Sequence, residues 1–149
     1  MMKKLFLYYS LTSNGETLVP YFAEKGYEIR QIEMKKKLPK KFFFRVLTGG
    51  FLAMLNKKPE LLNYEPNVSM FDEIVIGSPI WNGRFAIPLN TVLEQTDFSN
   101  KKLTFVLYAG SGIGPKAEKK IKKIYPDAKI IFLKQPKKYP QELKKISSL

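Results

Sequence analysis

Residues 4–17 read KLFLYYSLTSNGET and set the pattern for the whole chain. The apolar run over residues 4–9 predicts a buried strand, and the polar stretch over residues 16–25 predicts a helix. Gly26 follows that helix and is suited to end it, because glycine accepts the left-handed conformation of a helix cap. Hydroxyl groups, an amide and a glycine fill the loop between the two. A strand, a polar loop and a helix in this order predict an α/β fold.

The same alternation continues to the end of the chain. Four further strands are predicted over residues 27–32, 72–77, 103–108 and 128–133, and three further helices over residues 88–95, 116–125 and 140–146. Uninterrupted apolar runs such as Phe105-Val106-Leu107 are typical of parallel strands covered by helices on both faces. Right-handed crossovers leave few strand orders. We therefore predict a three-layer α/β/α sandwich around a five-stranded parallel sheet of order 2-1-3-4-5, the order favoured mainly by the loops described below.

The length of 149 residues, with 44% hydrophobic and 13% aromatic residues, predicts a single domain over residues 1–149. An irregular insertion at about residues 35–66 breaks the alternation. Its aromatic centre, residues 42–55, contains two glycines and has lysines on both sides. A buried helix with a break, a partly exposed flap over a ligand or partner, and contact with an anionic membrane surface are all compatible with this segment.

Two residue types are missing, and their absence excludes several classes of chemistry. The chain has no cysteine and no histidine. Disulfides, thiolate metal sites and serine–histidine triads are therefore excluded. No side chain stands out as a general acid or base, so we predict neither a catalytic residue nor a metal ligand. No apolar run approaches the roughly 18 residues of a membrane span, and the amino-terminal apolar run lacks the features of a signal peptide. We expect a cytoplasmic protein.

The net charge of +13 is unevenly distributed. Residues 34–58 carry a net charge of +8, residues 59–100 carry −5 and residues 101–149 carry +10. Such blocks are compatible with a solvated, lysine-rich surface or with a polyanionic partner. Only three of the basic residues are arginine, and aromatic and basic residues do not alternate as they do on base-stacking surfaces. The sequence therefore predicts no specific nucleic acid partner.

Loops after the predicted strands hold the candidate ligand-binding residues, because ligands of open α/β sheets bind outside the carboxyl ends of the strands. The first loop offers hydroxyl groups beside a helix amino terminus, which favours phosphate. Ordinary helix capping by Ser13 or Asn14 is the alternative. The loop over residues 77–83, GSPIWNG, holds the only tryptophan. Its indole is suited to stack on a planar ring, or it folds over the edge of the sheet.

A third loop, residues 109–114, is a run of small residues, AGSGIG, whose backbone amides are accessible. It is suited to bind the polar edge of a ring or simply turns the chain. No G-x-G-x-x-G motif is present, which excludes the dinucleotide fingerprint. Residues 110–116 fail as a phosphate-binding P-loop because Pro115 precedes the lysine and no hydroxyl residue follows it.

Together with TDFSNKKLTF over residues 96–105, these loops resemble the flavodoxin-like family of flavin mononucleotide (FMN) proteins over nearly the whole chain except the insertion. The first loop has the S-x-x-x-x-G-x-T form of the FMN reductase branch. The resemblance implies FMN as cofactor. It implies phosphate contacts from Ser10, Thr12, Asn14, Gly15 and Thr17. It implies contacts to the isoalloxazine ring from Pro79, Ile80, Trp81, Asn82 and Gly83, and on its other edge from Gly110, Ser111 and Gly112. Glu16 departs from the family, in which this residue is usually uncharged, and a carboxylate here repels phosphate unless it points to solvent.

These observations predict an FMN-binding redox protein that transfers electrons through a non-covalently bound flavin. An NAD(P)H-dependent quinone or flavin reductase on the same fold, and a flavin-free polyanion-binding or interaction domain, are the alternatives. A basic face favours an acidic protein as the redox partner. A small-molecule electron acceptor is the alternative partner. Lysines near the flavin, best represented by residues 35–41, predict a two-electron potential less negative than that of acidic flavodoxins.

Overall fold

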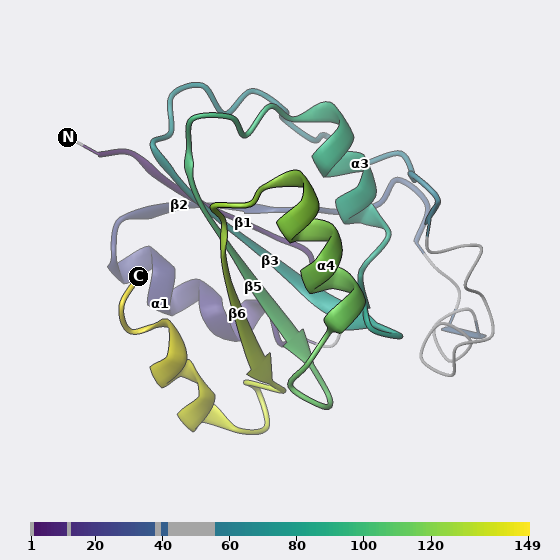
Figure 1. Ribbon diagram of the computed structural model, residues 1–149, viewed down its shortest axis with the longest axis vertical. Coiled ribbons are helices and arrows are strands. Elements are labelled where there is room, and N and C mark those ends of the chain that lie inside the picture. The colour runs from purple at the N-terminus through teal and green to yellow at the C-terminus, as the bar shows by residue number, and fades with distance from the viewer. Residues whose placement is uncertain (1, 12, 38–39, 42–55) are drawn as a thin grey trace.

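The computed structural model describes residues 2–11, 13–37, 40–41 and 56–149 (Figure 1). Its centre is a parallel sheet of β1 (Lys4–Tyr8), β2 (Tyr27–Gln31), β3 (Glu73–Trp81), β5 (Lys102–Ala109) and β6 (Lys129–Lys134) in the order β2-β1-β3-β5-β6. The short β4 (Arg84–Phe85) pairs only with β3, in antiparallel orientation. Without β4, the five parallel strands have the predicted order 2-1-3-4-5, and the predicted α/β fold is confirmed.

Helices cover both faces of the sheet (Figure 1). One face carries the 3-10 helix η1 (Glu16–Leu18), α1 (Val19–Glu24) and the 3-10 helix η3 (Pro140–Ile146). The other carries α3 (Pro88–Gln95) and α4 (Pro115–Ile124). Alternate strand residues supply two hydrophobic clusters, one on each side, with Phe22 and Ile146 in the first and Leu89 and Ile121 in the second. Both faces of the parallel sheet are therefore buried, as its uninterrupted apolar strands require.

Three predicted elements differ clearly in type or length. The helix expected over residues 16–25 begins as a 3-10 turn and is α-helical only from Val19 to Glu24, while Gly26 follows it with a positive φ of 82°. The helix expected over residues 140–146 is a 3-10 helix. The strand expected over residues 72–77 continues to Trp81, because Ile80 and Trp81 pair with β4 in a hairpin. The prediction of a loop over residues 77–83 is therefore wrong for most of its length.

The described end of the insertion contacts the segment after β2 and the helix α3. Met34 and Leu61 form an antiparallel bridge, and the Asn90 side chain donates a hydrogen bond to the Lys57 carbonyl at 3.0 Å. The Thr91 hydroxyl donates to the Pro59 carbonyl at 2.6 Å. The interpretations of a buried helix, a flap or a membrane contact concern residues 42–55, which lie outside the described residues. Among the helices that the structure does describe, none has the length and apolarity to span a membrane.

A buried polar contact crosses β1 at the amino end of the sheet. Tyr27 on β2 and Glu73 on β3 both stand opposite Lys4 in the register. The Tyr27 hydroxyl donates to Glu73 Oε1 at 2.8 Å, and Lys102 Nζ lies 3.7 Å from the same oxygen. Glu73 is almost completely buried. Burial, and then the hydrogen bond to Glu73, raise the pKa of Tyr27.

The two isoleucines of α4 test which face of this helix holds the core. Ile121 is fully buried, whereas Ile124 is 46% exposed. We expect Ile121→Ala to lower the free energy of unfolding by about 2–5 kcal/mol, because it leaves a cavity. The matched change Ile124→Ala is expected to lower it by less than about 1 kcal/mol. Chemical denaturation measures both, and equal losses would contradict the assignment of the buried face.

Tyr27→Phe tests the contact across β1. It removes the donor to a buried carboxylate, so we expect a loss of about 1–3 kcal/mol in the free energy of unfolding at neutral pH. Above pH about 10, the ordinary pKa of tyrosine, the wild type loses stability because its unfolded state releases a proton that the folded state keeps. The difference between the two proteins should then narrow.

Denaturation curves between neutral pH and about pH 11 follow this change through the tyrosine pKa. Tyr139→Phe, in the segment after β6, is the control and is expected to stay within about 0.5 kcal/mol of the wild type at neutral pH. A difference between the wild type and Tyr27→Phe that grows above pH about 10 would contradict the assignment.

Candidate functional site

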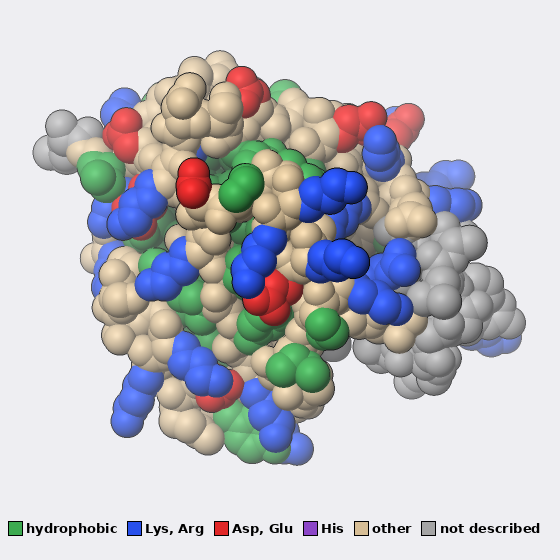
Figure 2. Space-filling model, in the orientation of Figure 1, with side chains coloured by type: hydrophobic (Ala, Val, Ile, Leu, Met, Phe, Trp, Pro, Cys, Tyr) green, Lys and Arg blue, Asp and Glu red, His purple; other side chains and the backbone are tan. Residues whose placement is uncertain are grey.

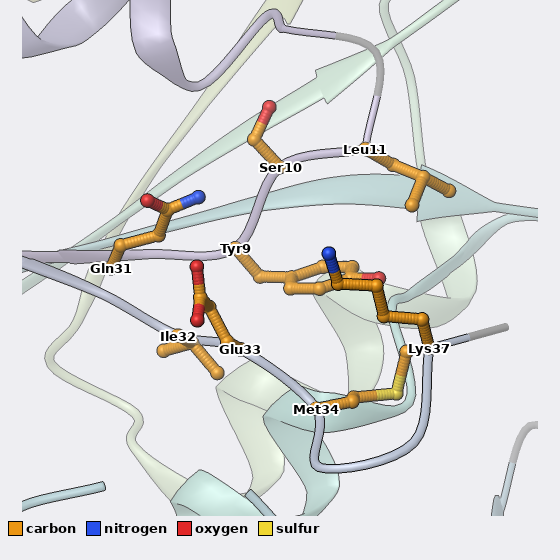
Figure 3. A pocket seen from close by; sticks show the side chains of 8 residues that line it. All are labelled: Tyr9, Ser10, Leu11, Gln31, Ile32, Glu33, Met34 and Lys37. Atoms are coloured by element: carbon orange, nitrogen blue, oxygen red, sulfur yellow. The ribbon is translucent and has the colours of Figure 1, made fainter. Parts of the chain in front are cut away.

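Two cavities open at the carboxyl ends of the strands, on either side of the loop that follows β1. The main cavity has a volume of about 560 Å³ and is lined by Leu11, Asn14, Pro79, Ile80, Trp81, Tyr108, Ala109, Gly110, Gln135, Lys137 and Lys138. The side cavity has a volume of about 320 Å³ and is lined by Tyr9, Ser10, Leu11, Gln31, Ile32, Glu33, Met34 and Lys37 (Figure 3). Leu11 lines both. Since β2 and β3 lie on opposite sides of β1, this is the switch point at which α/β sheets bind ligands.

The wall of the main cavity combines apolar and cationic groups. Residues 79–81 at the end of β3 and residues 108–110 at the end of β5 give it an apolar side. Lys137 and Lys138, from the segment between β6 and η3, give it a positive side. An apolar wall with a few polar groups at one end is the usual composition of a small-molecule site. This cavity is suited to a largely apolar ring system with a negative charge attached.

The first loop is held by hydrogen bonds within itself. The Gly15 N–H donates to Ser10 Oγ at 3.0 Å, and the Thr17 hydroxyl donates to the Ser13 carbonyl at 3.1 Å. The Ser10 hydroxyl accepts in this bond and keeps its own hydrogen for a further partner. Neither η1 nor α1 has a side-chain cap. The N-cap positions are Gly15 for η1 and Leu18 for α1, so neither Ser13 nor Asn14 stands at the N-cap of these helices.

Gly15 stands where the loop packs on two tyrosines. A Cβ atom there would lie 2.7 Å from Tyr8 Cδ2 and 2.8 Å from both Ser10 Cβ and the Tyr108 hydroxyl oxygen. The Tyr108 hydroxyl donates to the Tyr9 carbonyl. Burial raises the pKa of Tyr108, and burial raises the pKa of Tyr9 to about 12. Both hydroxyls therefore stay protonated at neutral pH, and Tyr108 acts as a fixed donor below the loop.

Asn14 connects this loop to the far side of the main cavity. Its side-chain oxygen accepts a hydrogen bond from the Lys137 N–H at 3.1 Å. The loop after β1 and the segment after β6 meet through this contact, although β3 and β5 separate the two strands in the sheet. The contact closes one side of the main cavity and sets the position of the Lys137 backbone.

Trp81 is not presented on a loop. It is the last residue of β3, pairs with Arg84 and is only 3% exposed. Its ring meets the Tyr9 ring edge to face, with centroids 5.9 Å apart. The expectation of a loop-borne indole is wrong because the hairpin pairing extends the strand to this residue. Trp81 still lines the main cavity, so its contact with a ligand is limited to the small part of the ring that remains accessible.

The remaining predicted residues are placed as follows. Ser10 lines the side cavity, and Asn14, Pro79, Ile80, Trp81 and Gly110 line the main cavity. Gly15 and Thr17 lie within the first loop and its helix start, while Asn82 and Gly83 form the hairpin turn with φ of 52° and 78°. The Ser111 hydroxyl donates to the Ile113 carbonyl, and Gly112 has a φ of 75° beside Lys134. Six predicted residues are therefore not among those that line the two cavities: Gly15, Thr17, Asn82, Gly83, Ser111 and Gly112. Thr12 lies outside the described residues.

The motifs in the sequence do not predict several of the lining residues. They are Leu11, Tyr108, Ala109, Gln135, Lys137 and Lys138 in the main cavity and Tyr9, Gln31, Ile32, Glu33 and Met34 in the side cavity. Most of them lie within three residues of the end of a strand, which is the signal that could have found them. Lys37 does belong to the lysine segment that the sequence placed near the ligand. Lys137 and Lys138 follow the fifth predicted strand, whose loop carried no motif.

Glu16, the residue that departs from the family pattern, is exposed. Its carboxylate accepts a long hydrogen bond, 3.4 Å, from the Gln31 side chain. It therefore points to solvent and toward β2. A carboxylate at this position was expected to repel phosphate unless it pointed to solvent, and the Glu16 side chain is exposed.

Comparison with solved structures identifies proteins of the same fold. A proposed flavoprotein from Bacteroides eggerthii is 19% identical, the match covers 100% of this chain and 99% of that chain, and the TM-score is 0.78. A proposed flavoprotein from Bacteroides uniformis is 23% identical over 87% of both chains, with a TM-score of 0.70. A flavoprotein from Lactobacillus acidophilus in complex with FMN is 24% identical over 88% of this chain and 91% of that chain, with a TM-score of 0.63. At these identities the likeness concerns the fold alone.

Among curated proteins, none matches the chain. A family model described as flavodoxin matches residues 52–139, which is more than half of the sequence. This match includes the β3–β4 hairpin, β5 and the segment after β6, and so most of the main cavity. On this evidence, the chain belongs to the flavodoxin family.

Proposed function

We propose that the protein binds FMN non-covalently in the main cavity and transfers electrons through it. The observation that carries this proposal is the main cavity itself, which lies at the switch point of the sheet with an apolar wall and a polar loop beside it. Membership of the flavodoxin family and the fold shared with an FMN-bound flavoprotein support it.

The apolar wall is the proposed place of the isoalloxazine ring. Ile80 is partly exposed within the cavity, and Pro79 and Gly110 bring backbone close to it. Gly110 is exposed, and a Cβ atom there would meet only the Gln135 side chain, at 3.3 Å. The space beside Gly110 is therefore open on the cavity side, as a flat ring requires.

The first loop is the proposed place of the phosphate. Ser10, on the side-cavity face of the loop, retains a hydroxyl hydrogen. On its main-cavity face, Asn14 accepts from the Lys137 N–H, and the Lys137 side chain adds positive charge to that wall. Gly15 and Thr17 hold the loop in shape, the first by its close packing and the second by its bond to Ser13. We keep Thr12 as a phosphate ligand on the basis of the sequence resemblance.

Asn82, Gly83, Ser111 and Gly112 do not line the cavity. We assign them to the two turns that bound it, since three of the four have positive φ values that fix the course of the chain. A role in direct ring contact, as the family resemblance implied, would require these turns to move toward the ligand.

When bound, the flavin supplies the electron chemistry, and the protein supplies position and electrostatics. Lys137 and Lys138 line the main cavity and Lys37 lines the side cavity, so positive charge lies beside the proposed site. This charge favours the anionic reduced cofactor and an acidic redox partner. Steady-state turnover with NADPH separates the reductase alternative from an electron carrier.

A pair of neighbouring substitutions tests the binding site. Gly110→Leu places a side chain into the main cavity at a position without positive φ, so we expect it to weaken FMN binding by about 100-fold or more through loss of the space the ring needs. Ser111→Leu is the matched control, because Ser111 is equally exposed but does not line the cavity. Fluorescence titration with FMN measures both affinities, and thermal unfolding confirms that both variants are folded.

Equal loss of affinity in both variants would move the ligand from the cavity to the rim loop. A wild-type protein that purifies colourless and takes up no added FMN would contradict the proposed function and leave the flavin-free polyanion-binding domain as the alternative.

A second pair of variants tests the electrostatics of the proposed flavin. Lys137→Gln with Lys138→Gln removes two positive charges from the cavity wall, so we expect the two-electron potential to become more negative by roughly 10–30 mV per lysine. Lys3→Gln with Lys144→Gln removes the same charge from residues that line neither cavity. Redox titration of the flavin-loaded proteins measures the shift, and an equal shift in both double variants would show that only net charge matters.

A further inference from the structure

A third cavity lies on the other side of the β3–β4 hairpin, against α4. It has a volume of about 310 Å³ and is lined by Asn56, Arg84, Phe85, Asn90, Lys116, Ala117, Lys119, Lys120 and Lys123. We call it the lysine cavity. Figure 2 shows lysine and arginine side chains gathered over the face of the molecule on which α4 lies. No residue of this cavity belongs to the main cavity.

The sequence of α4 concentrates the charge on one side. Lysines at positions 116, 119, 120 and 123 follow the spacing of residues that share one helix face. Ala117 and Ile121 turn into the core instead. Glu118, the only acidic residue of the helix, forms an ion pair with Lys122 at 2.8 Å. The lysines that line the cavity therefore have no carboxylate among the other lining residues.

Arg84 has a nitrogen atom without a hydrogen-bond acceptor in the part of the chain that the structure describes. It comes from β4, and its Nε atom is shielded from solvent and finds no hydrogen-bond partner there. The residue as a whole is only partly buried, and it is one of the groups that line the cavity. A buried N–H group without an acceptor is unfavourable, and an anion in the cavity would supply acceptor oxygens to the guanidinium.

Lys120 shows the effect of placing several cationic side chains close together. Its ammonium group donates to the Asn90 side chain at 3.0 Å and lies 4.9 Å from the centre of the Phe85 ring. Partial desolvation, followed by repulsion from Arg84 and Lys58, lowers its pKa. A neutral amide and an aromatic ring are weak partners for an ammonium group compared with an anion.

We propose that the lysine cavity binds a small phosphorylated anion that carries two or more negative charges. Ammonium and guanidinium groups converging from one helix face and one hairpin match the several acceptor oxygens of a phosphate. The volume of about 310 Å³ is at the small end of ligand sites, which favours a compact anion over an extended polymer. A free polyphosphate and the phosphate groups of a nucleotide share this chemistry.

This site does not depend on the proposed function. Ile80 and Trp81 on β3 line the main cavity, whereas Arg84 and Phe85 on β4 line the lysine cavity. The hairpin separates the two, so binding at one site is measurable when the other is empty.

Isothermal titration of the full-length protein with inorganic pyrophosphate tests the proposal, with and without saturating FMN. In the titration with saturating FMN, which fills the main cavity, we expect one site per chain for pyrophosphate. Lys119→Gln with Lys123→Gln changes two exposed lining lysines, and we expect it to weaken binding by about tenfold or more. Lys3→Gln with Lys144→Gln is the control of equal charge, and it should change the affinity by less than about twofold. Amide chemical shifts should change around β4, at Asn90 and along α4.

Titration with ADP distinguishes a nucleotide from a free polyphosphate as the natural ligand. Tighter binding of ADP than of pyrophosphate supports a nucleotide, and binding of pyrophosphate alone supports a free polyphosphate. The proposal is overturned by an absence of saturable binding, by equal weakening in the two double variants, or by shift changes spread over lysines elsewhere. It is also overturned if a single-stranded oligonucleotide binds at many sites and with an affinity that the Lys119→Gln, Lys123→Gln variant leaves unchanged.

Discussion

The candidate site depends on the packing of one glycine against two tyrosines. Gly15 has no side chain, so the loop after β1 comes down onto Tyr8 and Tyr108, where even a methyl group would lie within 2.8 Å of three neighbours. The Tyr108 hydroxyl then donates to the Tyr9 carbonyl at the point where β1 ends. With the loop fixed in this way, Ser10 faces one cavity and Asn14 the other. The two cavities are separate because this loop is seated between them.

The β3–β4 hairpin separates the main cavity from the lysine cavity. β3 extends past the end of the neighbouring strand β1 and turns at Asn82 and Gly83, both with positive φ. Ile80 and Trp81 then belong to the main cavity, and Arg84 and Phe85 to the lysine cavity. One short hairpin thus gives an apolar wall to one site and a cation to the other.

The sequence predicted the layers and the strand order because both follow from local patterns. Apolar runs such as Phe105-Val106-Leu107 indicate strands buried on both faces, and the connections between them leave few arrangements. The position of Trp81 could not be predicted in this way, because Ser78 and Pro79 interrupt the apolar run of the predicted strand over residues 72–77. It belongs to a strand only because Arg84 and Phe85 fold back and pair with β3. The lining residues Lys137 and Lys138 were missed because their segment has no motif of its own.

The sequence by itself therefore determined the fold, the location of the candidate site at the carboxyl ends of the strands, and the absence of cysteine and histidine chemistry. These depend on residue type and on periodicity along the chain. Only the tertiary structure decided that Asn14 meets Lys137, that Trp81 is buried against Tyr9, and that Arg84 joins the lysines of α4. Each of these contacts joins residues that lie far apart in the sequence or depends on strand pairing, and no pattern within one segment contains that information.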